Sequence, residues 1–356
     1  DETQDVHELL QEAEAKIFDI SQRSQKRDVT HISPVIGEAF ERMRNASKNE
    51  GNISGIPSGF TELDKITSGW QKSDLVIIAA RPAMGKTAFV LSMAKNMAVD
   101  YKIPVAIFSL EMSNVQLVNR LIMNVCEIEG SKIRNGRLSQ AEWEKLENNI
   151  RPLGDAPIYV DDTPGLSVFE LRSKARKLVR EKDIKVIIID YLQLMNANGA
   201  FFGSREQEVS IISRTLKGLA KELDIPVIAL SQLSRNVEKR DSSNSNVDGK
   251  KPLLSDLRES GAIEQDADMV CFIHRPEYYK LYDDGNGKDL RGLGQIIVAK
   301  HRNGATDEIW LRFIGKYTRF QNENDAYDEE IYAPAQYETT RSKLNSLPPE
   351  AQGAQL

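Results

Sequence analysis

The sequence predicts an α/β domain with a mostly parallel central sheet. Three observations favour this fold class. An apolar run over 75–80 leads into Gly85-Lys86-Thr87, short apolar runs alternate with helical patterns downstream, and two strand patterns flanking residue 302 suit an antiparallel hairpin. Strands that are buried on both faces of a parallel sheet are continuous apolar runs joined by helices. With 356 residues and 40% hydrophobic content, the chain can bury a sizeable core.

The loop after the first strand has the pattern of a phosphate-binding loop. It runs Ala80-Arg81-Pro82-Ala83-Met84-Gly85-Lys86-Thr87-Ala88 and feeds a predicted helix over 88–98. Its backbone N–H groups can surround the phosphates of a nucleotide, and the helix N-terminus adds partial positive charge. Lys86 is expected to neutralise phosphate oxygens, and the Thr87 hydroxyl to ligate Mg²⁺. A strand-to-helix turn with an exposed lysine is the alternative.

One position departs from the usual pattern of this loop. Ala80 stands where the pattern normally begins with glycine. Because alanine enters positive φ less easily than glycine, the opening turn is predicted to use ordinary backbone angles.

The regions outside the phosphate-binding domain are expected to be less compact. Residues 1–22 are predicted to form an amphipathic helix, whose apolar face must pack either on its own domain or on a neighbouring subunit. Residues 23–54 are predicted to be a partly helical connector, in which 35–43 suits a second short helix. The ATPase domain is expected over 55–321, followed by a polar, flexible tail over 322–356.

Within 55–321, further strand patterns alternate with helical patterns. The expected strands are 105–109, 186–189, 227–231 and 269–273, and the expected helices are 115–126, 140–150, 168–181 and 208–223. The hairpin is expected from strands at 294–300 and 308–315, with His301-Arg302-Asn303-Gly304 in its turn.

Ligands of open parallel sheets bind at the carboxyl ends of the strands, where three polar residues are candidates. Asp190 follows a buried run and is expected to bind Mg²⁺, partly through water. Glu111 lies two residues beyond the expected strand 105–109 and is expected to accept a proton from the attacking water. Gln232 ends another strand and can sense the γ-phosphate or contact a nucleic-acid-facing loop. The alternatives are a strand cap, a helix N-terminal acid and a polar strand end.

Basic residues near the end of the domain suggest contacts beyond its own loop. Lys300 and Arg302 lie on the same face of a strand end, and their charges are expected to project from the hairpin. They can reach a neighbouring subunit's nucleotide, with Arg302 as an arginine finger, or form a solvated basic turn. The polar segment 233–260 carries further basic residues, which either follow a phosphate backbone or are simply solvated.

Composition restricts the partners and the compartment. The net charge of −6 argues against a uniformly basic nucleic-acid surface but allows a locally basic channel. Cys126 and Cys271 lie in apolar surroundings and are expected to be buried reduced thiols, which favours the cytoplasm. No run approaches the roughly 18 apolar residues of a membrane span, and no leader pattern opens the chain.

Six short motifs between residues 80 and 304 carry a family resemblance that covers nearly the whole chain. They are Ala80-Arg81-Pro82-Ala83-Met84-Gly85-Lys86-Thr87, Phe108-Ser109-Leu110-Glu111-Met112-Ser113, Ile188-Ile189-Asp190-Tyr191-Leu192-Gln193-Leu194, Ser231-Gln232-Leu233-Ser234-Arg235, Asp256-Leu257-Arg258-Glu259-Ser260-Gly261 and Lys300-His301-Arg302-Asn303-Gly304. Taken together, they make the chain resemble the C-terminal motor region of replicative DNA helicases of the DnaB family. Ala305 departs from the family motif, in which proline is common, and this loss is expected to loosen the hairpin.

The resemblance implies a RecA-like ATPase fold and a homohexameric ring with ATP sites between subunits. The ring would move 5′ to 3′ along single-stranded DNA, with residues 1–22 as a linker helix that docks on the adjacent subunit. The family's usual N-terminal helical domain, which contributes to ring geometry and primase contact, is not among these 356 residues. Primase and a helicase loader are therefore the implied protein partners, and ATP and Mg²⁺ the implied cofactors.

The resemblance also implies roles for individual residues. Lys86 and Thr87 would hold phosphate and Mg²⁺, Glu111 would activate water, Asp190 would serve the metal, and Gln232 would couple the nucleotide to DNA. Lys300 and Arg302 would act across the subunit boundary. Arg258, Glu259 and Gly261 would contact the DNA backbone from a central loop. A recombinase-like filament, or a small-molecule kinase, is the alternative that shares the same core.

Overall fold

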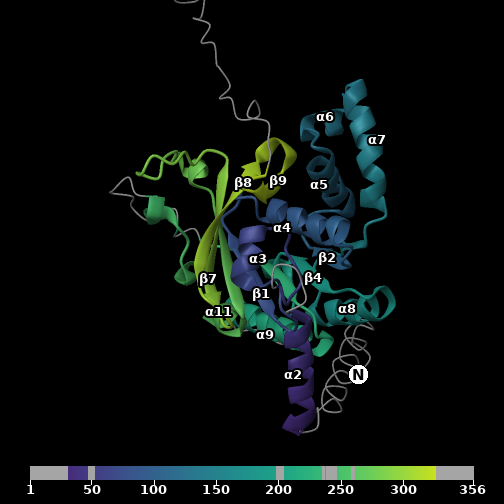
Figure 1. Cartoon of the computed structure of the whole chain (residues 1–356), viewed down its shortest axis with the longest axis vertical. Helices are drawn as coiled ribbons and strands as arrows, with labels where there is room; N and C mark the ends of the chain where they lie inside the picture. The colour runs from purple at the N-terminus through teal and green to yellow at the C-terminus, as the bar shows by residue number, and fades with distance from the viewer. Residues whose placement is uncertain are drawn as a thin grey trace, which may run out of the picture. The chain divides into compact units, whose positions relative to one another are not determined.

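The computed structural model describes residues 31–46, 53–197, 204–234, 237, 247–257 and 261–325. Within these residues, a nine-stranded sheet in the order β3-β2-β4-β5-β1-β6-β7-β8-β9 forms the centre of the domain (Figure 1). Its strands are β1 (Leu75–Ala80), β2 (Val105–Ser109), β3 (Ile158–Asp161), β4 (Val186–Asp190), β5 (Val227–Gln232), β6 (Met269–His274), β7 (Leu293–His301), β8 (Asp307–Ile314) and β9 (Arg319–Asn322). From β3 to β6 the neighbours pair in parallel, and from β6 to β9 they pair antiparallel. The expected mostly parallel sheet is confirmed.

The strand before the phosphate-binding loop lies in the interior of the sheet. β1 pairs with β5 and β6 in a register that aligns Ala80 with both Gln232 and Ile273. All six residues of β1 are buried. The loop after Ala80 and the end of β5 therefore meet at one carboxyl edge, as the sequence predicted.

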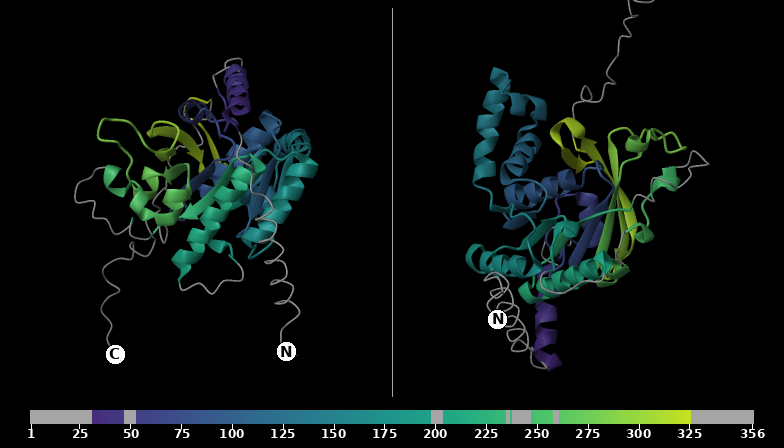
Figure 2. Two further views of the ribbon diagram at one scale, coloured as in Figure 1. Left: turned by 90° about the horizontal axis from the view of Figure 1, so that it is seen from below. Right: turned by 180° about the vertical axis from the view of Figure 1, so that it is seen from behind.

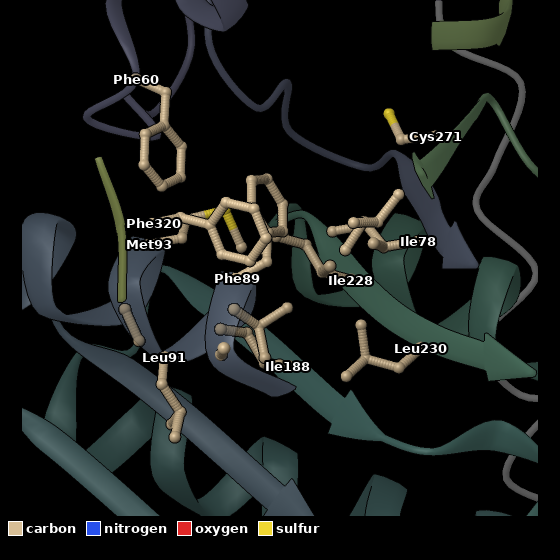
Figure 3. Packing of buried hydrophobic residues seen from close by; sticks show 14 of the residues in the cluster. Phe60, Ile78, Phe89, Leu91, Met93, Ile188, Ile228, Leu230, Cys271 and Phe320 are labelled. Carbon is tan, nitrogen blue, oxygen red and sulfur yellow. The ribbon is translucent and has the colours of Figure 1, made fainter. Parts of the chain in front are cut away.

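Helices cover both faces of the sheet (Figure 2). They are α3 (Thr61–Thr67), α4 (Lys86–Lys95), α5 (Asn114–Cys126), α6 (Gly130–Asn135), α7 (Gln140–Gly154), α8 (Val168–Lys182), α9 (Arg205–Leu223) and α11 (Gly261–Asp266). A further helix, α2 (Ile32–Ala46), contributes none of its described side chains to the buried core. Alternate strand residues enter two apolar layers. Ile78 and Ile228 pack with Phe89 of α4 on one face (Figure 3), and Ile77 packs with Leu216 of α9 on the other.

Serine caps fix where four of these helices begin. The side chains of Ser113, Ser139, Ser167 and Ser204 each accept a hydrogen bond from the backbone N–H three residues later. Such caps satisfy N–H groups that have no partner within the helix. α5, α7 and α8 consequently begin within one residue of the predicted positions, whereas α9 begins at Arg205 instead of 208.

The hairpin is present, but its turn is wider than predicted. β7 and β8 pair antiparallel as far as Val298 and Asp307. The residues between that pair form a long connection, so Asn303-Gly304 does not make a two-residue turn. β9 extends the antiparallel part, and neither β9 nor the edge strand β3 was predicted.

The predicted short helix at 35–43 is confirmed and is longer than expected. α2 covers Ile32–Ala46 and leaves Ile32, Phe40 and Met43 about two-thirds exposed, at 66%, 68% and 67%. The helix predicted at 1–22 lies outside the described residues, and so does the tail beyond 325. In the part of the chain that is described, no helix combines the length and apolarity needed to cross a membrane.

Candidate nucleotide site

The phosphate-binding loop uses positive φ at Ala83 (65°) and Gly85 (91°), whereas Ala80 keeps ordinary angles. The prediction for the opening turn is therefore confirmed. Gly85 caps α4, and a Cβ atom there would lie 3.0 Å from the ring of Phe320 and 3.3 Å from that of Phe313. The loop thus needs glycine at this position both for its backbone angle and for the close approach of two aromatic rings.

A cavity of about 680 Å³ opens over this loop. It is lined by Ala80, Arg81, Pro82, Ala83, Gly85, Lys86, Thr87, Ala88, Glu111, Arg120, Met123, Tyr191, Gln232, Phe313 and Thr318. Most of the predicted nucleotide-binding residues therefore meet in one place. Met84 does not line the cavity, because its side chain is buried in the core. Arg81 donates a hydrogen bond to the Leu233 carbonyl at 2.9 Å, which ties the loop to the end of β5.

The predicted Mg²⁺ residues meet beneath the loop. The Thr87 hydroxyl donates a hydrogen bond to Asp190 Oδ2 at 2.8 Å, and Lys86 Nζ lies 3.8 Å from Asp190 Oδ1. Asp190 is 1% exposed. Its Oδ1 atom accepts no hydrogen bond from the described part of the chain. Burial lowers the pKa of Lys86, and the nearby Asp190 carboxylate opposes that shift.

Glu111 and Gln232 approach the same cavity from two different strands. Glu111 lies between the end of β2 and Ser113, the cap of α5, so it stands outside that helix. The interpretation of Glu111 as the first-turn acid of a helix is therefore wrong. The backbone N–H of Gln232 donates to Gln193 Oε1 at 3.3 Å, and Gln193 Nε2 donates to the Ser231 hydroxyl at 2.8 Å. Gln193 thus fixes the end of β5 from the loop that follows β4.

Comparison with known proteins shows the family. Residues 55–322 match the family model described as DnaB-like helicase C terminal domain. The chain belongs to the DnaB-like helicase family. It is 45% identical over 330 residues to the replicative DNA helicase DnaB of Geobacillus stearothermophilus, covering 93% of this chain and 70% of that protein. It is 43% identical over 325 residues to the replicative DNA helicase DnaC of Bacillus subtilis, covering 91% and 69%.

Solved structures agree with this assignment and confirm the RecA-like ATPase fold. An isolated ATPase domain superimposes with a TM-score of 0.75 at 41% identity, covering 83% of this chain and 99% of that one. A DnaB-like replicative helicase, described together with its interactions with primase, gives a TM-score of 0.71 at 40% identity. That match covers 88% of this chain and 71% of the other.

In this DnaB-like domain, Lys300 and Arg302 lie far from the phosphate-binding loop of their own chain. The Arg302 N–H donates to the Asp268 carbonyl, and the Asp268 N–H donates to the Leu75 carbonyl. Arg302 is therefore level with the start of β1, about 16 Å along the strand from Ala80. Neither basic residue lines the cavity described above.

The expectation that both charges project from the hairpin is wrong for Lys300. Its ammonium donates to the Glu264 carbonyl at 2.5 Å and to the Ala267 carbonyl at 2.9 Å. Burial, together with the neighbouring Arg302 guanidinium, lowers the pKa of Lys300. Arg302 remains about half exposed, with 46% of its side chain accessible.

The predicted DNA contacts are only partly covered by the described residues. Arg258 and Glu259 lie outside them, whereas Gly261 is the first residue of α11. The roles of all three residues stay predictions.

Phe313 and Tyr191, which line the cavity, and Arg275, which lies beside it, were not assigned to the site from the sequence. Phe313 comes from β8, and the Arg275 guanidinium lies 3.9 Å from the centre of its ring. Arg275 also donates to the Ala83 carbonyl at 3.3 Å, so it connects the loop to the antiparallel strands. Tyr191 places its ring 4.3 Å from Lys86 Nζ. Tyr191 lies within one of the six motifs, directly after Asp190, but Phe313 and Arg275 carried no local signal.

Proposed function

We propose that this chain is the motor of an ATP-dependent replicative DNA helicase, which moves 5′ to 3′ along single-stranded DNA and unwinds the duplex at the fork. The observation that carries the proposal is that Lys86, Thr87 and Glu111 line one and the same cavity. Membership of the DnaB-like family supports the nucleic-acid substrate, because the relatives named above are replicative DNA helicases.

ATP is proposed to bind with its phosphates against the loop and the N-terminus of α4. Backbone N–H groups there have no partner within the helix and favour anions. Lys86 keeps 15% of its side chain exposed, and Asp190 lies 3.8 Å from its ammonium. A triphosphate beside Lys86 adds negative charge, which favours the ammonium form that burial disfavours.

The residues present fit a hard divalent cation such as Mg²⁺. Asp190 Oδ1 is buried without a hydrogen bond from the described residues. The Thr87 hydroxyl, while donating to Oδ2, keeps its oxygen lone pairs available. Oxygen ligands and retained waters suit Mg²⁺, so Thr87 would hold it directly and Asp190 partly through water. When bound, Mg²⁺ would neutralise charge on the β- and γ-phosphate oxygens.

Hydrolysis is proposed to be direct attack by water on the γ-phosphate. Glu111 is exposed at the cavity, and its carboxylate would orient that water and accept its proton. The side-chain amide of Gln232 makes no hydrogen bond to the described residues, whereas its backbone is fixed by Gln193. The Gln232 side chain can therefore bind the γ-phosphate when it is present and change position when it is lost. Such a change would also shift the segment that follows β5.

The site is proposed to be completed by a neighbouring subunit in a homohexameric ring. Lys300 and Arg302 lie at the opposite edge of the sheet from their own loop, so they suit a nucleotide bound by another copy. Arg302 would act as the arginine finger. The exposed apolar residues of α2 support assembly, because a helix with such a face is stabilised by burying it on a partner.

Single-stranded DNA is proposed to pass through the ring and contact Arg258, Glu259 and Gly261. Contacts to the backbone make such binding independent of sequence. Primase and a helicase loader are the proposed protein partners, and the primase interaction stated for the solved DnaB-like helicase supports the first of them. A cytoplasmic location follows from this proposed role in replication.

The experiment that tests this function measures ATP hydrolysis at several protein concentrations, with and without single-stranded DNA. The same samples are then assayed for unwinding of a fork with a free 5′ tail, with Lys86→Ala as the inactive control. We expect turnover that rises cooperatively with protein concentration, increases with DNA and accompanies unwinding. DNA-stimulated hydrolysis without unwinding would instead favour a recombinase-like ATPase, and hydrolysis unaffected by DNA would contradict the motor function.

A further inference from the structure

The two basic residues proposed to act across the subunit boundary are held by one short segment of their own chain. β7 ends beside the start of β6, where Lys300 pairs with Val270 and His301 with Met269. The residues just before β6 are the last turn of α11 and the junction 267–268. This segment therefore lies directly against Lys300 and Arg302.

Lys300 is bound by the last turn of α11. Its ammonium donates to the carbonyl oxygens of Glu264 and Ala267, at 2.5 and 2.9 Å. Carbonyl groups at a helix C-terminus have no partner within the helix and carry partial negative charge, so they attract a cation. The position of the Lys300 charge is consequently tied to the position of α11.

Arg302 is bound by the same segment through both its backbone and its side chain. Its guanidinium donates through Nη1 to Asp268 Oδ1 at 3.2 Å and through Nη2 to the Gln265 carbonyl. Its backbone N–H donates to the Asp268 carbonyl at 2.9 Å. These contacts use both terminal nitrogens of the guanidinium, which fixes the direction in which the planar group points.

Asp268 is itself held firmly, which makes it suited to orient another side chain. It is 5% exposed. Its Oδ2 atom accepts hydrogen bonds from the backbone N–H of Leu75 at 2.8 Å and from the Lys217 ammonium of α9. One carboxylate oxygen is thus anchored to the start of β1 and to α9, while the other faces Arg302.

We propose that Asp268 and the C-terminal carbonyls of α11 position the basic pair Lys300 and Arg302 for a neighbour's nucleotide. Asp268 is then a positioning residue, which acts on hydrolysis through Arg302 and does not itself touch the nucleotide. The inference rests on the proposed action of Arg302 in trans, and it adds which groups determine where that charge points.

The same arrangement connects the basic pair to the predicted DNA contact. α11 has six residues, so its first residue, Gly261, lies only about 7.5 Å along the helix axis from its last residue, Asp266. The Ser213 hydroxyl of α9 donates to Asp266 at 2.5 Å and holds the end of the helix. A shift of Gly261 on DNA binding would move the carbonyls that hold Lys300 and Arg302. DNA stimulation of hydrolysis should therefore depend on Asp268.

The test compares the full chain with Asp268→Asn, Arg302→Ala and the double variant. For each, kcat of the assembled protein is measured with and without single-stranded DNA, and nucleotide affinity is measured separately. We expect Asp268→Asn to lower kcat about 10- to 100-fold, as expected for a misplaced catalytic group, and to leave nucleotide affinity within about twofold. Stimulation by DNA should fall as well. The double variant should be no slower than Arg302→Ala, because both changes remove the same interaction.

Two further variants separate positioning from simple destabilisation. Asp64→Asn neutralises another buried aspartate, which instead accepts from the backbone N–H groups of Ser58 and Gly59 at 2.8 and 3.1 Å. It should lower the unfolding midpoint without changing kcat of the folded fraction. If Asp268→Asn does not fold, Asp268→Glu keeps a charge opposite Lys217 but displaces the carboxylate from Arg302, and it should show the same loss of kcat.

The outcomes distinguish this inference from the proposed function on which it rests. If Arg302→Ala hydrolyses ATP normally, the action in trans is wrong, and this inference fails with it. If Arg302→Ala is slow but Asp268→Asn and Asp268→Glu are as fast as the unaltered chain, the action in trans stands and the positioning role is wrong. Losses of kcat that multiply in the double variant would also overturn the positioning role.

Discussion

Replacing Thr87 by valine tests the polar contact beneath the phosphate-binding loop. The hydroxyl donates to Asp190 Oδ2 at 2.8 Å, and Asp190 Oδ1 accepts no hydrogen bond from the described residues. Valine has nearly the same shape as threonine, so the cost of the change comes mainly from the lost hydroxyl donor. The buried Asp190 carboxylate is then left with Lys86 at 3.8 Å as its partner.

The expected cost follows from the charge of the acceptor. A hydrogen bond to a charged group contributes roughly 1.5–3 kcal/mol to stability, so Thr87→Val should lower the free energy of unfolding without nucleotide by about 2 kcal/mol. Thr87→Ser keeps the hydroxyl and loses a methyl group, and it should cost about 1 kcal/mol or less. Serine also keeps the oxygen that would ligate Mg²⁺, whereas valine removes it.

The assay combines urea unfolding of both variants with ATP affinity measured with and without Mg²⁺. We expect the increase in ATP affinity on adding Mg²⁺ to persist in Thr87→Ser and to fall at least about tenfold in Thr87→Val, as for loss of a metal-site partner. Equal stability of the valine and serine variants would refute the importance of the Thr87–Asp190 hydrogen bond. An unchanged Mg²⁺ effect in the valine variant would refute Thr87 as a metal ligand.

Three further predictions concern the base, a buried carboxyl and the loop glycine. Glu111→Gln should bind ATP normally but lower kcat about 10²- to 10⁴-fold, measured by single-turnover hydrolysis, because the amide cannot accept a proton; a loss of affinity without loss of kcat would contradict this role. Burial beside Asp268 raises the pKa of Asp74 to about 6 from its ordinary 3.8, so the folded state holds this proton more tightly than the unfolded state. The stability that this bound proton contributes is fully present below about pH 4. It is lost as the pH rises from about 4 through 6, which lowers the free energy of unfolding by up to about 3 kcal/mol. Asp74→Asn should flatten unfolding stability between about pH 4 and 6, and an unchanged slope would argue against this ionisation. Gly85→Ala should lower the free energy of unfolding by about 1–2 kcal/mol, because of its positive φ and the nearby Phe320 ring; the control Gly154→Ala, where an added Cβ would meet no atom within 4 Å, should not destabilise the protein.

The interior of the sheet was predictable because its strands are buried on both faces. β2 has its predicted bounds, and β4, β5 and β6 each extend one residue beyond theirs. Continuous apolar runs identify such strands without knowledge of their neighbours. β3 and β9 were missed because each has four residues and is not a continuous apolar run. Their pairing with β2 and β8 stabilises them, and a sequence pattern does not contain that information.

The phosphate end of the site was also predictable, but its surroundings were not. Lys86, Thr87 and Asp190 meet as expected, because a loop and a strand end at the same edge of the sheet come together in any such fold. Phe313 enters from β8 and Arg275 from the residue after β6, and the position of these elements over the loop depends on the whole sheet order. The hydrogen bonds from Lys300 to the carbonyls of Glu264 and Ala267 were missed because they too depend on how strands distant in the sequence are arranged in the sheet.

The central claim is that each ATP site needs residues from two copies of the chain. The direct test mixes Lys86→Ala with Arg302→Ala, each inactive alone, and measures DNA-stimulated ATP hydrolysis as the ratio of the two is varied. In a mixed ring, an Arg302→Ala subunit supplies an intact loop, and a Lys86→Ala neighbour supplies an intact Arg302. Random mixing at equal amounts should restore about a quarter of the interfaces and a corresponding share of the activity. Activity no higher than that of either variant alone, in mixtures shown to co-assemble, would contradict a site shared between subunits.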